Sequence, residues 1–403
     1  PSPYCDEYFE VLKGRISYIE TSRGCPYSCA FCLSSRCGGV RYFDIERSKK
    51  EILALANSGS KTIKFVDRTF NANKKRANII ISFLKENYGK NIPTDVCFHF
   101  EIAGDILDDE GINLLGSLPK GFVQLEIGMQ SFNEKTLAAI NRKTDCKLLI
   151  NNILRLTAFN NMHIHIDLIA GLPYEDLSSF KNSFNIAYSL NSQMLQLGFL
   201  KVLYGTAMSD FPEKFPAYYS KKAPYEVIST PWLSPEDIEL LKAVEDSNER
   251  LHNSGRFKNT LNYVLKASDL TPFDLMKYIG KKLYPCHGIS LDEYTDRFMS
   301  VLKELKGIDA LELRDNMLID RISTNSSGKI PKSLVVFDKR FKKIKHILNR
   351  SEDTVLIPNV KRFIGILYTQ NKIVYVDYVD PKQDEFTLNY IDLRQFEAEN
   401  EKR

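Results

Sequence analysis

The chain has 403 residues, of which 43% are hydrophobic and 26% are charged, and its formal net charge is +4. This length predicts two or three domains, and because the charge is nearly balanced, nothing global demands a nucleic-acid or anionic-membrane partner. There is no run of 18 apolar residues and no amino-terminal signal segment. We therefore predict no membrane partner. The eight cysteines, three of them clustered, indicate metal ligation in a reducing cytoplasm and not a disulfide framework. Because the sequence opens at Pro1 and not at methionine, we expect it to be part of a longer protein.

β-rich runs alternate with helical patterns through the first half of the chain. Residues 44–59, for example, have helical spacing and end on Gly59, a typical helix stop. The six β-rich runs are 15–21, 62–67, 95–101, 122–128, 163–171 and 194–203. Strands that alternate with helices in this way predict a parallel α/β sheet. Since a complete barrel of this kind has eight strands, we expect a partial (β/α)6 TIM-like barrel over residues 15–212.

After the predicted barrel the pattern changes. Helical patterns with little strand between them predict a mostly helical region at 213–330. The helical patterns are 235–253, 271–283, 291–305 and 308–322. Four β-rich runs from Ser333 onward predict a small antiparallel β module at 331–396. Residues 397–403 are expected to be a polar tail.

Three of the eight cysteines are clustered in "RGCPYSCAFC", at Cys25, Cys29 and Cys32. A closed structural zinc site uses four ligands, and no second cysteine pair or His-x-His pair follows nearby. Three thiolates on a four-iron cluster leave one iron without a protein ligand, and catalytic metal sites keep such an open position. The spacing therefore predicts a [4Fe-4S] cluster on these three cysteines. A zinc knuckle or chance spacing is the alternative.

Cys-x3-Cys-x2-Cys with an aromatic residue before the third cysteine resembles the signature of the radical SAM superfamily. Five later motifs resemble, in order, the strand motifs of the branch with coproporphyrinogen oxidases, methylthiotransferases, the Elongator catalytic subunit and cobalamin-binding members. They are "FVDRTFN" (65–71), "FEIAGD" (100–105), "LEIGMQSFNEKTLAAINR" (125–142), "DLIAGLP" (167–173) and "LYGTAM" (203–208). The resemblance implies an enzyme that reductively cleaves S-adenosylmethionine to a 5′-deoxyadenosyl radical. It also implies an electron donor such as flavodoxin or ferredoxin.

The resemblance implies cofactor-binding roles for five further residues. Phe31 is expected near the adenine, and Glu101, Gln130, Arg142 and Asp167 match positions that contact S-adenosylmethionine. Arg142 suits the methionyl carboxylate, because a guanidinium can pair with a carboxylate through two hydrogen bonds. Asp167 suits ribose hydroxyls, as acidic residues do in dinucleotide sites. A structural ion pair or a helix cap is the alternative for each of them.

Asp67, His163 and His165 are the predicted catalytic residues. "FVDRTF" stands where many members carry a Gly-Gly-Glu segment, and Asp67 is expected to take its place near the methionyl amino group. His163, His165 and Asp167 alternate on one strand, so their side chains share a face. We predict that both histidines line the barrel and bind substrate or relay protons. Ordinary hydrogen-bonded lining and a second metal site are the alternatives.

The narrowest resemblance is to bacterial radical SAM proteins with an amino-terminal cobalamin-binding domain and a carboxyl-terminal domain of unknown function. It implies that residues 1–14 are a linker after such a domain. No Asp-x-His-x2-Gly cobalamin signature occurs here, so cobalamin is expected only through a domain outside this chain. Three functions stay open: cobalamin-dependent methyl transfer, cobalamin-independent modification of RNA or a small molecule, and a non-catalytic iron–sulfur protein. The basic run 339–350 suits RNA, although such runs are more often solvated faces.

Overall fold

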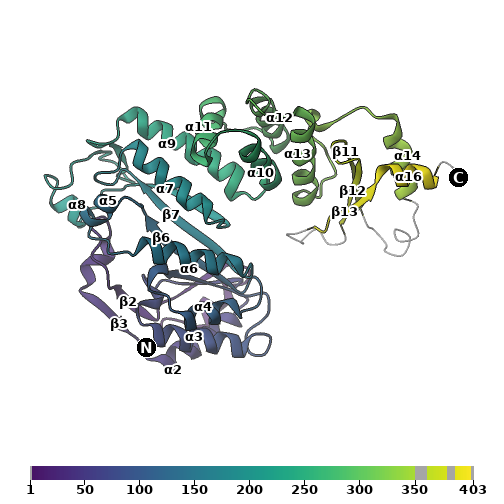
Figure 1. The fold of residues 1–403 in the computed structure, drawn as a ribbon. Coiled ribbons are helices and arrows are strands. Elements are labelled where there is room, and N and C mark those ends of the chain that lie inside the picture. The colour runs from purple at the N-terminus through teal and green to yellow at the C-terminus, as the bar shows by residue number, and fades with distance from the viewer. Residues whose placement is uncertain (1, 350–360, 379–385, 401–403) are drawn as a thin grey trace. The chain divides into compact units, whose positions relative to one another are not determined.

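The computed structural model describes residues 2–349, 361–378 and 386–400. The chain forms two compact units, Pro1–Leu241 and Lys242–Arg403 (Figure 1). No helix in the described part of the chain is long and apolar enough to cross a membrane.

A six-stranded sheet organises the first unit, in the order β1-β4-β5-β6-β7-β8. The strands are β1 (Ile16–Ile19), β4 (Thr62–Phe65), β5 (Cys97–Ile102), β6 (Val123–Gln130), β7 (His163–Ala170) and β8 (Met194–Phe199). Every neighbouring pair is parallel. Strands β1 and β8 are the two edges of the sheet, so the barrel is not closed. The predicted partial barrel is confirmed.

Helices cover one face of this sheet (Figure 1). They are α2 (Ile45–Ala56), α3 (Lys74–Asn87), α4 (Asp109–Gly116), α6 (Cys146–Ala158) and α7 (Leu177–Ser189), and α1 (Asp6–Glu10), α5 (Glu134–Ala139) and α8 (Ala207–Asp210) are short. Each of the five longer helices begins after an Asp or Asn whose side chain accepts a backbone N–H of the first turn, which satisfies a donor left free there.

Alternation along the strands separates an apolar face from a polar one. On β7, Ile164, Ile166 and Leu168 are fully buried, whereas His163 and Asp167 on the opposite face are only partly buried. Successive strand residues point to opposite faces, so the apolar set packs under the helices. The other face of the sheet, which is open and concave, is therefore polar. It carries the predicted site residues that lie on strands.

The cysteine loop contains a hairpin that the sequence did not predict. Strand β2 (Ser22–Cys25) pairs antiparallel with β3 (Gly39–Tyr42), and a short 3-10 helix, η1 (Leu33–Cys37), lies between them. Gly24 has φ 103°, and a Cβ added there would lie 2.0 Å from the carbonyl oxygen of Gly39. Only glycine fits this close approach of two backbones. Gly24 is thus the residue that allows β2 and β3 to pair.

The second unit is helical and then β-rich, as predicted. The two-strand hairpin of β9 (Tyr218–Tyr219) and β10 (Val227–Ser229) still belongs to the first unit. The helices are α9 (Pro235–Asn248), which crosses the boundary between the units, α10 (Lys258–Ala267), α11 (Pro272–Leu283), α12 (Leu291–Leu302) and α13 (Ala310–Thr324). Helix α10 was not predicted. Strands β11 (Lys361–Leu367), β12 (Lys372–Tyr378) and β13 (Asn389–Asp392) form an antiparallel sheet.

Helices sandwich this small sheet. Helix α13 packs on one face, and α14 (Lys339–Leu348) and α16 (Leu393–Asn400) pack on the other. The first predicted β-rich run, from Ser333, is not a strand, because a 3-10 turn at Lys332–Leu334 leads into α14. The predicted tail begins within α16, and residues 401–403 lie outside the described part of the chain.

Candidate functional site

A cavity of about 160 Å³ lies beside the cysteine loop, at the carboxyl ends of strands β5, β6 and β7. Eight of the eleven predicted site residues line it: Cys25, Cys29, Phe31, Cys32, Glu101, Gln130, Arg142 and Asp167. These residues are spread along the sequence from Cys25 to Asp167. Since the carboxyl ends of parallel strands carry the sites of α/β barrels, this cavity is the candidate active site.

The three cysteines of the motif are free thiols with different surroundings. Cys29 is buried, and its Sγ lies 3.9 Å from Nη1 of Arg142. The Sγ of Cys25 lies 3.4 Å from the hydroxyl of Thr69. Burial raises the pKa of Cys29, and the positive charge of Arg142 opposes that effect. Arg142 therefore favours the thiolate form, which is the form that binds metal.

Among the described residues, no three His, Cys, Asp or Glu side chains converge on a point that one metal ion could occupy. A tetrahedral zinc site requires such convergence, because every ligand lies about 2.0–2.3 Å from the same ion. In a four-iron cluster each thiolate binds a different iron atom, so the cysteines need not converge. The three thiolate donors thus fit a four-iron cluster, which leaves its fourth iron open.

Arg142 is held at the boundary between the cysteine loop and the sheet. Its Nη2 donates to the carbonyl of Gly128 at 2.9 Å, and its Nε donates to the hydroxyl of Thr144 at 3.1 Å. The guanidinium carbon lies 4.6 Å from the ring centroid of Tyr27. A guanidinium has five N–H donors, so donors are left for a carboxylate in the cavity.

Gln130 reaches the cavity from a strained backbone. Its φ is 69°, in the left-handed region that residues other than glycine rarely adopt. Its side-chain amide folds over Gly128, where an added Cβ would lie 2.2 Å from Nε2 of Gln130. Gly128 therefore gives room to Gln130 while its carbonyl holds Arg142.

A charged cluster reaches from the concave face into the cavity, where Glu126 is one of the lining residues, and sequence reasoning missed Glu126 and Lys64. Oε2 of Glu126 lies 3.3 Å from Nε2 of His99 and 3.2 Å from Nζ of Lys64. The bond from His99 and the charge of Lys64 lower the pKa of Glu126 to about 2. Burial and the nearby Glu126 charge raise the pKa of Glu101, whose carboxylate lies 3.5 Å from Arg68. Alternation along β6 places Glu126 on the same face as Gln130, and this was the available signal for Glu126.

His163 and His165 lie on the same concave face but do not line the cavity. Nε2 of His165 lies 3.0 Å from Oδ1 of Asp167. Burial lowers the pKa of His165, but the contact with Asp167 outweighs it, so the pKa is raised overall. Burial lowers the pKa of His163. The two histidines therefore differ in charge preference although they are two residues apart.

Two family profiles match this chain. The sequence profile described as "Radical SAM superfamily" matches residues 19–187. The chain carries a radical SAM domain. A second profile, described as "Protein of unknown function (DUF4080)", matches residues 213–380.

Two relatives and one solved structure illustrate the similarity of the radical SAM domain to known proteins. The cobalamin-dependent radical SAM methyltransferase TokK of Streptomyces tokunonensis is 26% identical over 237 residues, 57% of this chain and 34% of TokK. The tRNA-2-methylthio-N(6)-dimethylallyladenosine synthase of Rickettsia rickettsii is 27% identical over 180 residues, 43% of this chain and 40% of the synthase. The chain thus spans well under half the length of these curated relatives. The structure of the cobalamin-dependent radical enzyme OxsB with aqua-cobalamin and S-adenosylmethionine has a TM-score of 0.47 at 14% identity and covers 85% of this chain and 57% of OxsB.

Asp67 is not brought to the cavity of the radical SAM domain. It is 1% exposed, and its carboxylate accepts hydrogen bonds from the backbone N–H of Thr21 at 2.7 Å and from the hydroxyls of Thr21 and Ser22. Both oxygens are occupied by the residues that start β2. Asp67 therefore anchors the strand that leads into the cysteine loop.

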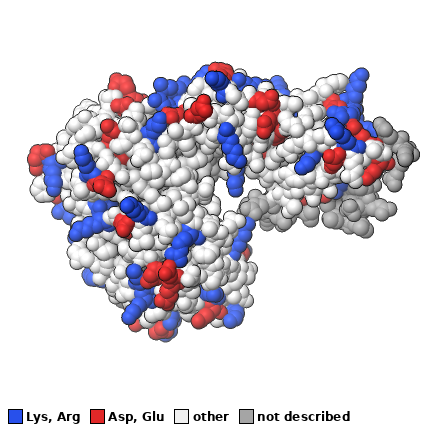
Figure 2. Space-filling model, in the orientation of Figure 1, with Lys and Arg blue, Asp and Glu red and all other residues white. Residues whose placement is uncertain are grey.

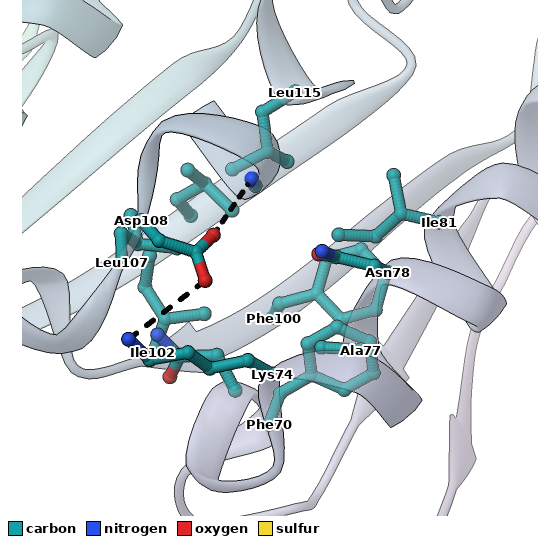
Figure 3. A pocket seen from close by; sticks show the side chains of 13 residues that line it. Phe70, Lys74, Ala77, Asn78, Ile81, Phe100, Ile102, Leu107, Asp108 and Leu115 are labelled. Atoms are coloured by element: carbon teal, nitrogen blue, oxygen red, sulfur yellow. Dashed lines mark hydrogen bonds and ion pairs between the residues drawn. The ribbon is translucent and has the colours of Figure 1, made fainter. Parts of the chain in front are cut away.

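A second cavity in the radical SAM domain, of about 20 Å³, lies among α3, α4 and β5 (Figure 3). Its walls are mostly apolar and include Phe70, Ile81 and Phe100. At its rim, Asp108 lies 3.8 Å from Nζ of Lys74 and caps α4. The space holds about one water molecule, so it is a packing void and no candidate site.

Proposed function

We propose that the chain contains the active site of an enzyme that binds a [4Fe-4S] cluster through Cys25, Cys29 and Cys32. When bound, the reduced cluster supplies the electron that cleaves S-adenosylmethionine to methionine and a 5′-deoxyadenosyl radical. One observation carries the proposal: the three thiols, the Arg142 guanidinium and four polar side chains of the sheet line one cavity. The match of residues 19–187 to the radical SAM profile supports it.

Within this proposal the polar residues bind S-adenosylmethionine. Arg142 pairs with the methionyl carboxylate, because its guanidinium is fixed by Gly128 and retains free donors. Asp167 and Glu101 accept hydrogen bonds from hydroxyl or amino groups, and Gln130 can both donate and accept. Phe31 lies in the cysteine motif and lines the cavity, where it offers an apolar surface to the adenine.

We assign substrate binding and proton transfer to His163 and His165, which lie on the concave face next to Asp167. The raised pKa of His165 favours its charged form and the lowered pKa of His163 favours its neutral form. His165 is thus better suited to donate a proton and His163 to accept one. The salt-bridged Glu126 beside them fixes a negative charge in the lining of the cavity.

We propose cobalamin-dependent methyl transfer as the net reaction, with cobalamin bound by a part of the protein outside this chain. The name and similarity of TokK support this assignment. Modification of RNA is the second candidate, and the similarity to the Rickettsia tRNA methylthio synthase favours it.

The test is anaerobic reconstitution with iron and sulfide, followed by dithionite and S-adenosylmethionine. We expect about four iron atoms per chain and 5′-deoxyadenosine detected by mass spectrometry. Cys29→Ala should lose both the cluster and the product. Cys37→Ala is the matched control, because Cys37 is an exposed thiol close in sequence that does not line the cavity. A fully loaded cluster in Cys29→Ala refutes the ligand assignment.

A further inference from the structure

Helix α14 of the second unit carries a stripe of basic side chains on its outer face. Lys339, Lys342, Lys343 and His346 follow the spacing i, i+3, i+4, i+7, and all four are exposed. Residues at this spacing lie on one face of a helix. We call these four residues the basic stripe. Blue side chains gather where Figure 1 places α14 (Figure 2).

The opposite face of α14 is already used for packing. Ile344 and Leu348 are buried against residues of β11, β12 and α16, and Phe341 packs on the same cluster. The basic stripe therefore cannot turn inward without breaking this core. It is a fixed feature of the surface of the module.

Positive charge is concentrated at this place. Residues 332–349 contain six lysines and arginines and one aspartate, whereas the net charge of the whole chain is +4. Arg340 is paired with Asp338 and Glu397. Within the described ranges, no ion pair involves the three lysines of the basic stripe. As far as the described residues go, their charge is therefore left for an external anion.

An exposed aromatic side chain adjoins the basic stripe. Phe337 is 88% exposed and Val335 is 62% exposed, in the segment just before the amino-terminal cap of α14. This is the segment that the sequence predicted as a strand. As a strand it would bury alternate side chains, but the structure leaves Phe337 in solvent. An exposed ring beside several free cations is the combination that binds a strand of nucleic acid, through base stacking and phosphate contacts.

We propose that the basic stripe and Phe337 bind single-stranded RNA. The lysines contact successive phosphates, and the ring of Phe337 stacks on a base. A membrane is the weaker fit, because an amphipathic helix binds a bilayer with its apolar face, and that face of α14 is buried in the module. The inference stands apart from the proposed radical chemistry, since binding needs neither cluster nor S-adenosylmethionine.

The test is fluorescence anisotropy with a labelled 20-nucleotide single-stranded RNA, over a series of salt concentrations. Each neutralised phosphate contributes about −0.7 to the slope of log K against log salt for single strands. The triple variant Lys339→Gln, Lys342→Gln, Lys343→Gln should therefore reduce the magnitude of the slope by about 2. The matched control replaces three exposed lysines elsewhere in the second unit, Lys266, Lys303 and Lys306, by Gln. It should leave affinity and slope unchanged.

Phe337→Ala separates stacking from charge. Stacking of one base on an aromatic ring contributes roughly 1–3 kcal/mol, which corresponds to a loss of roughly 5- to 150-fold in affinity with an unchanged salt slope. Three results overturn the proposal: no RNA binding by the unaltered chain, equal loss in the stripe variant and its control, or binding to anionic phosphatidylserine vesicles without binding to RNA. None of these results bears on the production of 5′-deoxyadenosine. Failure of the RNA-binding proposal is therefore distinguishable from failure of the proposed function.

Discussion

Glu175 allows a sharp test of the electrostatics behind the radical SAM site. It is fully buried after β7, and its Oε1 accepts hydrogen bonds from the hydroxyls of Ser131 at 2.7 Å and Ser183 at 3.1 Å. Its Oε2 has no hydrogen-bond partner among the described residues. Burial raises the pKa of Glu175 from 4.5 to about 7. The folded protein thus holds a proton between pH 4.5 and 7 that the unfolded chain releases.

The sign and size of the effect follow from this difference. A raised carboxyl pKa contributes stability that is complete below pH 4.5 and is lost as pH rises through 7. A shift of about 2.5 units corresponds to roughly 3 kcal/mol. In Glu175→Gln the neutral amide replaces the carboxyl and cannot ionise. The variant should therefore gain stability relative to the parent by about 2–3 kcal/mol between pH 5 and pH 8.

The assay is urea unfolding followed by tryptophan fluorescence. The chain has one tryptophan, Trp232, and its ring centroid lies 4.7 Å from that of Tyr174, the neighbour of Glu175. The signal thus reports on the segment that carries the substitution. Glu86→Gln, at an exposed position on α3, is the matched control for loss of a carboxylate. A stability difference between Glu175→Gln and the parent that is independent of pH would refute the reasoning.

Three further predictions concern the cavity. Arg142→Ala should weaken S-adenosylmethionine binding by roughly 1.5–3 kcal/mol, the contribution of a charge-assisted hydrogen bond, and unchanged affinity in calorimetry would reject the carboxylate assignment. Gly128→Ala should displace the amide of Gln130, because the new Cβ meets Nε2 at 2.2 Å. We expect circular dichroism to show a folded protein, with lower affinity for S-adenosylmethionine. Full affinity would show that the amide is not needed for binding. Gln130→Gly should stabilise the protein against urea by roughly 1 kcal/mol, since glycine tolerates φ 69°. Binding of S-adenosylmethionine should weaken in the same variant. A loss of stability would refute the claim that the backbone of Gln130 is strained.

Local patterns predicted the parts of the site that depend on spacing. The three cysteines lie in one loop, and the odd-numbered residues of β7 share a face because strand periodicity is two. Contacts that depend on register across strands could not be predicted in this way. The pairing of Glu126 with Lys64 crosses from β6 to β4, and it becomes visible only once β5 is known to lie between them.

Asp67 shows why a motif does not define a role by itself. Its position after β4 suggested a catalytic residue near the methionyl amino group, but the same position also faces the backbone of Thr21, just before β2. Three short hydrogen bonds satisfy the carboxylate there. A buried acid satisfied in this way is costly to free. Tertiary contact therefore favours anchoring over catalysis, and no sequence pattern reports that contact.

The residues that shape the site are largely residues that do not line it. Asp67 ties the start of the cysteine loop to the sheet, and Glu175 ties Ser131, the residue after Gln130, to α7. The strained φ of Gln130 costs energy that the unfolded chain does not pay. The strained φ persists because Ser131, the residue after Gln130, is held in place by its buried hydrogen bond to Glu175. The buried polar network therefore maintains a conformation that the local sequence disfavours, and this conformation presents the Gln130 amide to the cavity.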